Sequence, residues 1–236
     1  MSQLNPKLKL DKVGIIGGMG PSCSGHYFNV LIQKLNERGL LQDEDFPEII
    51  HYSVPLPDWN ETGFAIKSKE GNDRIIKALQ DYVKKLTQMG VKIIAVPCNT
   101  IHFMYDEMDS ATHVKVLNIL HETGKYAKEH GFKKIAVFGS RSTRDLGLYD
   151  FLNPIKANDK EQDFIDSLIE AVMFGKQTQE HRDAFKELIE GRYYRGADAV
   201  VLGCTELPLL IDQKDTHVPL INTTEILAIK LANEIV

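Results

Sequence analysis

The sequence predicts an α/β fold in which two similar lobes each contain a parallel β-sheet. Short apolar runs typical of buried strands alternate with amphipathic segments of helical length. This alternation produces parallel sheets because a helix between two strands carries the chain back in a right-handed crossover. The second half of the chain also repeats the strand and loop pattern of the first half, which indicates two lobes.

The first half begins with a short β-branched strand and a helix, followed by a second strand, a long amphipathic helix and an apolar strand buried on both faces. In chain order, these segments are Val13–Gly17, Ser24–Arg38, Glu48–Val54, Lys69–Met89 and Val91–Val96. Apolar residues recur with a period of about 3.6 residues in the fourth segment, and Gly90 directly after it is a typical helix end.

The second half contains the same alternation. Lys134–Phe138 and Ala199–Leu202 are predicted strands, helices are predicted over much of residues 144–195, and Thr223–Val236 is predicted to be a closing helix. Each strand is short and rich in Val, Ile, Ala or Leu, as expected for the buried strands of a parallel sheet.

Two pairs of segments carry the internal repeat. DKVGIIGGMGP resembles KKIAVFGSRST, and KIIAVPCNT resembles DAVVLGCTE. In each half, one strand therefore ends in a glycine-containing loop and a later strand ends in a cysteine. Ligands bind at the carboxyl ends of the strands in open parallel sheets, so we expect the two edges to face each other across a cleft.

Composition excludes several functional classes. Net charge is −5, and the scattered lysines and arginines give no basic face for nucleic acid. No apolar run approaches the ~18 residues of a membrane helix, and the polar start MSQLNPKLKLDK is not a signal peptide. The three cysteines match no zinc spacing and are expected to be reduced thiols. We therefore expect a cytoplasmic protein with no metal and no membrane partner.

The GGMGP loop has two interpretations. Gly17, Gly18 and Gly20 stand between a strand and a helix, where glycines allow close approach to a ligand and the helix start favours an anion. The loop matches neither GxGxxG nor a Walker motif. It is either a tight turn before a helix or a site for a carboxylate.

Cys98 and Cys204 are the candidate catalytic residues. A single cysteine at a strand end is more often a small buried apolar residue than a catalyst. A pair of thiols in equivalent positions of two lobes is different, because two opposed thiols could remove a proton from one face of a carbon and deliver one to the other. This is the requirement of a racemase that works without a cofactor.

The residues that follow the thiols have alternative roles. Asn99, Thr100 and Thr205 could bind a substrate carboxylate or cap the following helix. Glu206 could orient a thiol, anchor an ammonium group or act as a favourable charge at a helix start. His102 could simply pack on its helix, and Cys23 reads as a small residue at a helix entry.

Together, VGIIGGMGP, VPCNTIH, LGCTE and VPLINTTEI resemble the aspartate/glutamate racemase family, the cofactor-independent racemases with two thiols. The resemblance runs from Lys12 to the last predicted helix. It implies two flavodoxin-like lobes, formed by residues 1–114 plus 222–236 and by residues 115–221, with the active site in the cleft between them. It also implies catalysis by Cys98 and Cys204, no pyridoxal phosphate or metal, and a homodimer.

The resemblance assigns substrate contacts to six further positions. These are Met19, Gly20, Asn99, Thr100, Thr143 and Thr205.

The sequence departs from the family where a second carboxylate would bind. PLPDWNE keeps Asp58 but has Trp59 where related aspartate racemases have an arginine, and Met173 stands where a lysine is expected. Loss of two cations weakens the case for an acidic substrate, while Trp59 offers an apolar or cation-binding face. Arg141, with Arg144 nearby, could replace the lost anchor or could face solvent.

Two smaller departures concern the framework. Asn222 replaces a common aspartate, and the segment NPIKANDKEQ is short, which predicts a reduced sheet edge in the second lobe.

Three functions remain open. The first is an amino-acid racemase, with aspartate or glutamate as the substrate that the resemblance implies. The second is a decarboxylase or cis–trans isomerase of a small diacid on the same scaffold. The third is a non-catalytic amino-acid-binding protein. Retention of both thiols favours racemisation.

Overall fold

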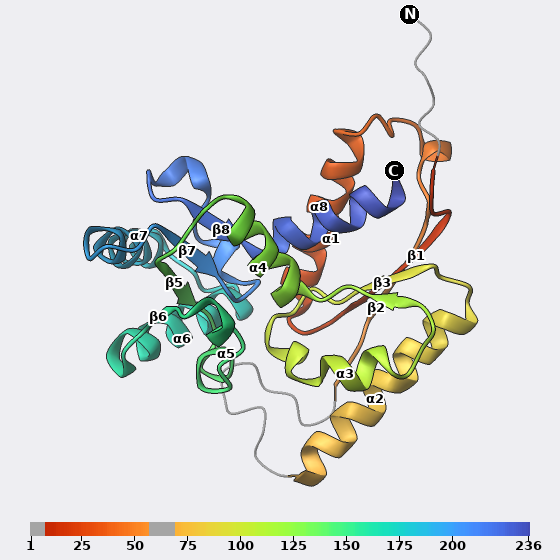
Figure 1. The fold of residues 1–236 in the computed structure, drawn as a ribbon, viewed down its shortest axis with the longest axis horizontal. Coiled ribbons are helices and arrows are strands. Elements are labelled where there is room, and N and C mark those ends of the chain that lie inside the picture. The colour runs from red at the N-terminus through yellow and green to blue at the C-terminus, as the bar shows by residue number, and fades with distance from the viewer. Residues whose placement is uncertain (1–7, 57–68) are drawn as a thin grey trace, which may run out of the picture.

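The computed structural model describes residues 8–56 and 69–236 and contains two four-stranded parallel sheets (Figure 1). The first sheet has the order β2-β1-β3-β4 and the second has the order β6-β5-β7-β8. The strands are β1 (Lys12–Gly17), β2 (Glu48–Ser53), β3 (Ile93–Ala95), β4 (Lys115–Val116), β5 (Ile135–Phe138), β6 (Ile155–Lys156), β7 (Ala199–Leu202) and β8 (Leu220–Asn222). The two sheets thus have the same order of connection, and the two-lobe α/β fold is confirmed.

Helices cover both faces of each sheet. They are α1 (Pro21–Asn36), α2 (Lys69–Gln88), α3 (Tyr105–Asp109), α4 (Ile119–Glu129), α5 (Arg141–Asp145), α6 (Asp159–Met173), α7 (Gln179–Tyr194) and α8 (Thr223–Ile235). Apolar residues of α2 and α3 pack on one face of the first sheet, and those of α6 and α7 pack on one face of the second.

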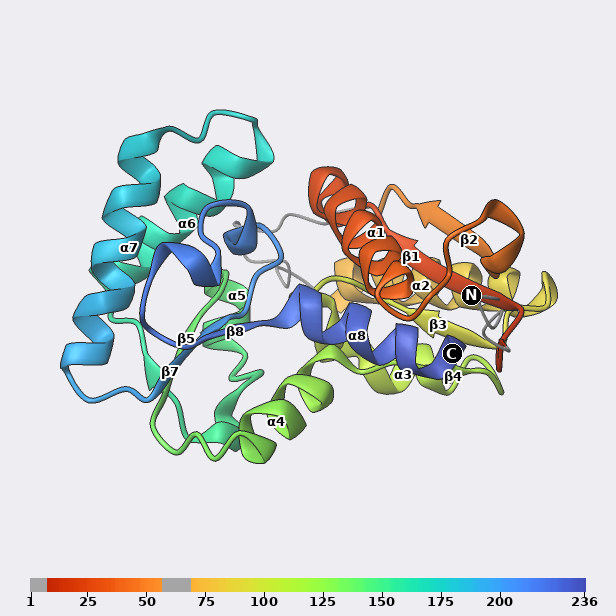
Figure 2. The same ribbon diagram turned by 90° about the horizontal axis from the view of Figure 1, so that it is seen from above.

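The other faces of the two sheets share one core. Apolar residues of α1, α4 and α8 join residues of β1 and β3 to residues of β5 and β7 in a single cluster, called here the shared core. Figure 2 shows α8 leaving the second sheet and running along the first lobe beside α1, as the resemblance implied. An ion pair between Lys34 of α1 and Glu225 of α8, 2.8 Å apart, lies at the same interface.

Asparagines begin both of the helices that connect the lobes. Asn118 follows β4 and its side chain accepts the backbone N–H groups of Leu120 and His121, both at 3.0 Å. Asn222 ends β8 and caps α8 in the same way. An asparagine Oδ1 satisfies N–H groups that lack a partner in the first turn, so Asn222 serves the framework.

The short edge strands were not predicted. β4 and β6 have two residues each and β8 has three, too few for a periodic pattern. β6, in the segment NPIKANDKEQ, has two residues where the equivalent edge strand β2 has six, in line with the reduced sheet edge expected there. β3 is shorter than the predicted Val91–Val96. β4 pairs with β3 of the first sheet, and the division of the chain at residues 114/115 stays a prediction.

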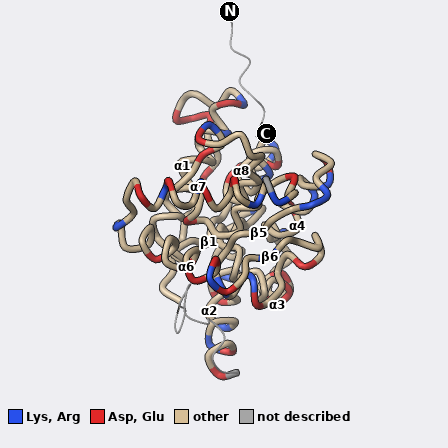
Figure 3. The backbone as a smooth tube through the Cα atoms, turned by 90° about the vertical axis from the view of Figure 1, so that its left-hand side faces the viewer, with Lys and Arg blue, Asp and Glu red and all other residues tan. Residues whose placement is uncertain are grey.

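Charge is mixed over the described surface. Figure 3 shows basic and acidic residues interspersed along the chain. None of the described helices is both long and apolar enough to cross a membrane.

Candidate active site

The glycine loop after β1 is fixed by its own hydrogen bonds. Gly18 has φ +98°, and a Cβ there would lie 2.4 Å from the carbonyl oxygen of Val54, so only glycine fits. The Ser24 hydroxyl accepts the N–H of Gly18 at 2.8 Å and donates to the carbonyl of Gly20 at 3.0 Å. The loop is therefore a tight turn before a helix, and its role as a site for a carboxylate stays a prediction.

Cys98 follows β3 through Val96 and Pro97 and is 1% exposed. A 3₁₀-helical segment, Thr100–Met104, begins two residues after it. His102, on the next turn, binds the carbonyl of Cys98 through Nδ1 at 2.7 Å. A carbonyl only accepts, so Nδ1 carries the hydrogen in this bond. The loop that contains Cys98, called here the first thiol loop, is thereby held by a buried side chain.

His102 also ties the loop to the start of α4. Its Nε2 lies 3.3 Å from the backbone N–H of Ile119, which donates to it. A neutral ring with hydrogen on Nδ1 accepts from Ile119 at Nε2, whereas only a protonated ring could also donate from Nε2 to the carbonyl of Leu117, which lies 3.3 Å away. Burial lowers the pKa of His102, which agrees with the neutral form. His102 therefore joins the first thiol loop to the start of α4, rather than only packing on its helix.

Cys204 follows β7 and is 2% exposed. Its Sγ donates to Oε2 of Glu206 at 2.9 Å, and the hydroxyl of Thr205 donates to the same oxygen at 3.4 Å. Glu206 is fully buried. The second thiol loop therefore contains a carboxylate in direct contact with its thiol.

Thr100 of the first thiol loop reaches the loop that follows β5 in the second lobe. Its Oγ1 lies 2.9 Å from Oγ of Ser140 and 3.0 Å from Oγ1 of Thr143. Ser140 and Thr143 are themselves 3.2 Å apart. These three buried hydroxyls form a triangle across the junction between the lobes, called here the hydroxyl triangle.

Glu206 of the second thiol loop lies against the first lobe, just as Thr100 of the first thiol loop contacts the second lobe. A Cβ at Gly20 would lie 2.7 Å from Oε1 of Glu206, so the carboxylate sits directly against the glycine loop of the first lobe. No described residue donates a hydrogen bond to this oxygen, although it is buried. A side chain at position 20 would displace it.

A third contact between the lobes runs through Asn99. Tyr149, buried in the second lobe, donates its hydroxyl to Oδ1 of Asn99 at 2.5 Å. Asn99 Nδ2 donates to the hydroxyl of Thr223 at the start of α8, at 3.0 Å. Burial raises the pKa of Tyr149. A Cβ at Gly203, next to Cys204, would lie 3.3 Å from the Tyr149 ring, so Tyr149 contacts the neighbour of one thiol and lies beside the loop that carries the other.

Comparison with known proteins identifies the family. The family model described as Asp/Glu/Hydantoin racemase matches residues 16–231.

The chain belongs to this family.

A broad-specificity amino-acid racemase of Bacillus subtilis, RacX, is 31% identical to it over 226 residues, covering 92% of this chain and 94% of the relative. The chain is thus an isomerase, an amino-acid racemase, as the resemblance implied.

Two solved structures resemble this racemase along nearly its full length. An aspartate racemase homologue from Pyrococcus horikoshii is 28% identical with a TM-score of 0.79, covering 95% of this chain and 100% of that one. The aspartate racemase of Picrophilus torridus is 28% identical with a TM-score of 0.77, covering 94% of each chain. Both support the arrangement in two similar lobes.

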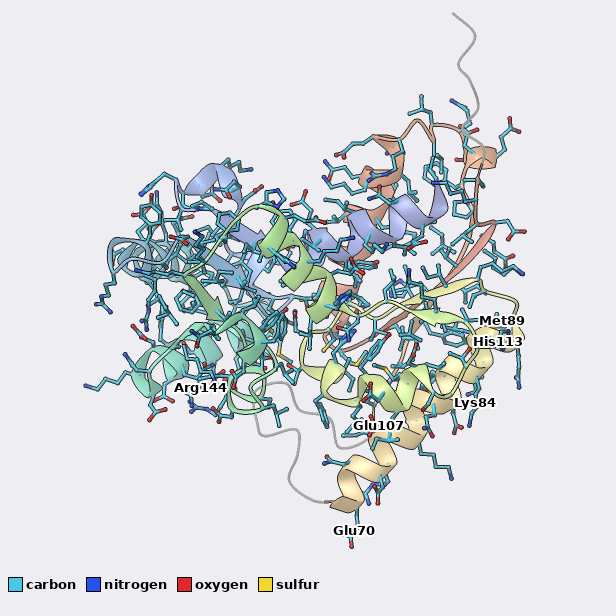
Figure 4. All side chains as sticks on the ribbon, in the orientation of Figure 1. Glu70, Lys84, Met89, Glu107, His113 and Arg144 are labelled. Atoms are coloured by element: carbon cyan, nitrogen blue, oxygen red, sulfur yellow. The ribbon has the colours of Figure 1, made fainter. Side chains whose placement is uncertain are left out.

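The two arginines near the junction of this racemase are already paired. Arg141 forms ion pairs with Asp163 and Asp166 of α6, the second at 3.1 Å. Arg144 pairs with Asp145 and Asp159 at 2.7 and 3.0 Å, within the second lobe (Figure 4). A role for Arg141 as a substrate anchor stays a prediction that requires it to leave two carboxylates.

Two of the other predicted residues, Met173 and Met19, pack in apolar clusters. Met173 packs with the apolar cluster under α6 and α7, whereas Asp58 and Trp59 lie outside the described residues. Met19 is 2% exposed in the apolar cluster on the outer face of the first sheet, the cluster that also contains Cys98. No group of three or more His, Cys, Asp or Glu residues in the described part of the chain is arranged to hold a metal ion.

Sequence reasoning missed Tyr149 and Ser140. Tyr149 stands in the stretch DLGLYDFL, which has no catalytic pattern, and only the folded chain brings it to Asn99. Ser140 was visible as the residue after a strand-ending glycine, and its side chain caps α5 by accepting the N–H of Thr143 at 3.3 Å. A serine at a helix start is a known cap signal.

Proposed function

We propose that this protein is a cofactor-independent racemase that interconverts L- and D-amino acids by proton transfer at Cα between Cys98 and Cys204. One observation carries the proposal. The two thiol loops occupy equivalent places after β3 and β7, and each contacts the opposite lobe, through Thr100 to the hydroxyl triangle and through Glu206 to Gly20. These contacts support both thiols acting at one junction.

In this mechanism one sulfur acts as a thiolate and removes the Cα proton from one face of the substrate. The opposite sulfur, as a thiol, donates its proton to the other face of the carbanion. Each turnover thus leaves the first sulfur protonated and the second deprotonated, so the cycle can run in reverse on the product. General acid–base groups placed on both faces supply the rate enhancement.

The substrate carboxylate would be held by polar groups that already gather at the junction. Thr100 and Thr143 present hydroxyls there, and Asn99 flanks the first thiol, whereas Thr205 donates to Glu206 beside the second. Hydrogen bonds to the carboxylate also stabilise the charge that moves onto it when Cα is deprotonated. Both thiols are buried in this structure, so entry of the substrate requires a change in the structure that exposes them.

The charges around the junction bear on the substrate side chain. Arg141 and Arg144 are each held by two carboxylates, which weakens the case for an acidic side chain. Aspartate and glutamate are what the resemblance implies, whereas the relative RacX is named for broad specificity. We propose a substrate range that includes amino acids with neutral or cationic side chains. A homodimer in the cytoplasm is proposed on the resemblance alone.

Proton NMR in D₂O tests the proposal with a panel of L- and D-amino acids and no added cofactor. Loss of the Cα–H signal together with appearance of the enantiomer, measured by chiral chromatography, is the expected result for at least one amino acid. Cys98→Ala and Cys204→Ala should each abolish racemisation. Cys23→Ala is the matched control, because Cys23 is equally buried but lies in α1.

The same experiment separates the alternatives. A panel in which no amino acid exchanges its Cα–H would overturn the racemase. Release of CO₂ or formation of a trans diacid from small diacids would then indicate the decarboxylase or cis–trans isomerase. Binding of an amino acid without exchange would indicate a binding protein.

A further inference from the structure

Glu206 carries an unsatisfied buried oxygen. One oxygen, Oε2, accepts hydrogen bonds from Cys204 and Thr205. The other, Oε1, is buried with no described donor. A buried carboxylate oxygen without a donor is costly, more so than a neutral group. The chain therefore holds a carboxylate that needs a donor from outside.

The donor must fit the space against Gly20. Oε1 faces the backbone of the glycine loop so closely that the Cβ of any other residue at position 20 would lie 2.7 Å from it. The N–H of Gly18 in this loop is already bonded to Ser24. A substrate carboxylate placed here would meet the negative charge of Glu206, so this end of the junction disfavours an anion and favours a cation.

The substrate α-ammonium group is the cation that this position fits. The ammonium nitrogen is bonded to Cα, and the Cys204 thiol that acts on Cα is itself 2.9 Å from Glu206. One carboxylate can therefore hold the thiol with Oε2 and the ammonium with Oε1. An ammonium group has three donors and a full charge, which makes the hydrogen bond charge-assisted.

We propose that Glu206 Oε1 binds the α-ammonium group of the substrate and so restricts this racemase to free α-amino acids. This inference rests on the proposed function. Compounds whose Cα carries a hydroxyl, an acylated nitrogen or the amide nitrogen of a hydantoin ring lack the cation and are poor ligands. Glu206 thereby separates free amino acids from hydantoins within a family that is named for both.

Glu206 does not exchange a proton in this scheme. The ammonium group stays protonated, and its positive charge beside Cα favours loss of the Cα proton. Its charge also offsets that of Glu206, which would otherwise oppose formation of a Cys204 thiolate. Binding of the correct class of substrate and ionisation of the thiol are therefore linked through one side chain.

Calorimetric titration with matched ligand pairs tests the assignment. The pairs are DL-alanine with DL-lactate, DL-phenylalanine with DL-phenyllactate, and DL-aspartate with DL-malate, racemic so that turnover causes no net change. The intact protein should bind the amino member of at least one pair more tightly by on the order of 10- to 100-fold, as expected for a hydrogen bond to a charged group. Glu206→Gln should reduce this preference to about 3-fold or less.

Two further variants keep the test decisive. Gly20→Ala leaves the charge in place but displaces Oε1, because the added Cβ would lie 2.7 Å from that oxygen, and φ at position 20 is negative; it should also reduce the preference. Glu129→Gln removes the same charge from an exposed position on α4 and should leave the preference unchanged.

The outcomes distinguish this inference from the racemase itself. A preference for the amino member that survives in Glu206→Gln and Gly20→Ala overturns the ammonium site, and so does an intact protein that prefers no amino member. Either result can occur together with Cα–H exchange by the intact protein, and that exchange would still support the proposed racemase activity. Conversely, a Glu206-dependent preference without exchange would support the ammonium site and contradict the proposed racemase activity.

Discussion

The two thiol loops share a position in their sheets but differ in chemistry. After Cys98, the third residue of the motif is Thr100, whose hydroxyl joins two others across the junction. After Cys204 it is Glu206, whose carboxylate contacts both its own thiol and the opposite lobe. Four residues after each thiol stand His102, which holds its loop by hydrogen bonds, and Pro208, which can donate none.

A repeated fold can thus hold two different acid–base groups. A carboxylate 2.9 Å from the Cys204 sulfur favours the protonated thiol, because a second negative charge there is repelled. The first loop places neutral hydroxyls in the equivalent position. We therefore expect Cys204 to carry its proton in the protein without substrate, and Cys98 to act first as the base.

The largest expected effect comes from removing either thiol. Cys98→Ala and Cys204→Ala should each lower racemisation by at least ~10²–10⁴-fold, the usual contribution of a general acid or base. The remaining thiol can still exchange protons on its own face, so each variant should exchange the Cα–H of one enantiomer without inverting it. The two variants should act on opposite enantiomers, as NMR in D₂O with pure L and D ligands would show.

Exchange of the same enantiomer by both variants would contradict opposed thiols. Cys23→Ala should behave as the unmodified protein in these assays.

A smaller effect is expected from the hydroxyl triangle. Thr100→Val removes one hydroxyl and keeps the shape, leaving Ser140 and Thr143 with each other as partners. We expect a loss of about 1–3 kcal/mol in the free energy of unfolding, typical of breaking a buried hydrogen bond, measured by urea denaturation. Thr112→Val is the control, because Thr112 bonds the hydroxyl of Thr87 at 2.6 Å away from the thiols; it should lose stability without losing activity. Equal activity losses in both variants would argue against a role for the triangle in the site.

The smallest expected effect is on how the free energy of unfolding depends on pH, and it comes from His102 in the first thiol loop. Burial lowers the pKa of His102 below the ordinary 6.5, so at acidic pH the unfolded chain binds a proton at this residue that the native protein excludes. Its stabilising contribution is full above about pH 6.5 and is lost as pH falls through the lower native pKa, by at most ~1.4 kcal/mol per pH unit. Urea denaturation between pH 7 and pH 5 should show this slope.

His102→Gln lacks the titrating ring and should flatten that part of the slope. His113→Gln is the control for the number of histidines, since His113 is exposed. An unchanged slope in His102→Gln would mean that other groups set the acid sensitivity.

The sequence was sufficient for the features that repeat or that carry strong local patterns. Strand Ala199–Leu202 and the start of the helix at Thr223 were predicted at the observed residues, because buried β-branched runs and caps are local signals. The short strands β4, β6 and β8 escaped notice because two or three residues have no period. The thiols and Glu206 were predicted from their place at strand ends.

Contacts between distant segments could not be predicted. Arg141 pairs with side chains more than twenty residues away on α6, and no local sequence pattern indicates that pairing. Tyr149 reaches Asn99 across 50 residues of chain. Both depend on how the lobes pack together, which is set by the whole core. The gap between prediction and structure is therefore widest at the junction, where the candidate site lies.

The shared core has a consequence for synthesis of the chain on the ribosome. Leu227, Leu231 and Ile235 of α8 complete the apolar layer that covers Val13 and Ile15, and the carbonyl of Ile235 accepts the N–H of Lys9 at 2.8 Å. The first sheet cannot close this layer until residue 235 has left the exit tunnel. Nascent chains arrested before α8 should therefore expose the uncovered apolar layer and recruit chaperones, whereas those arrested after it should not.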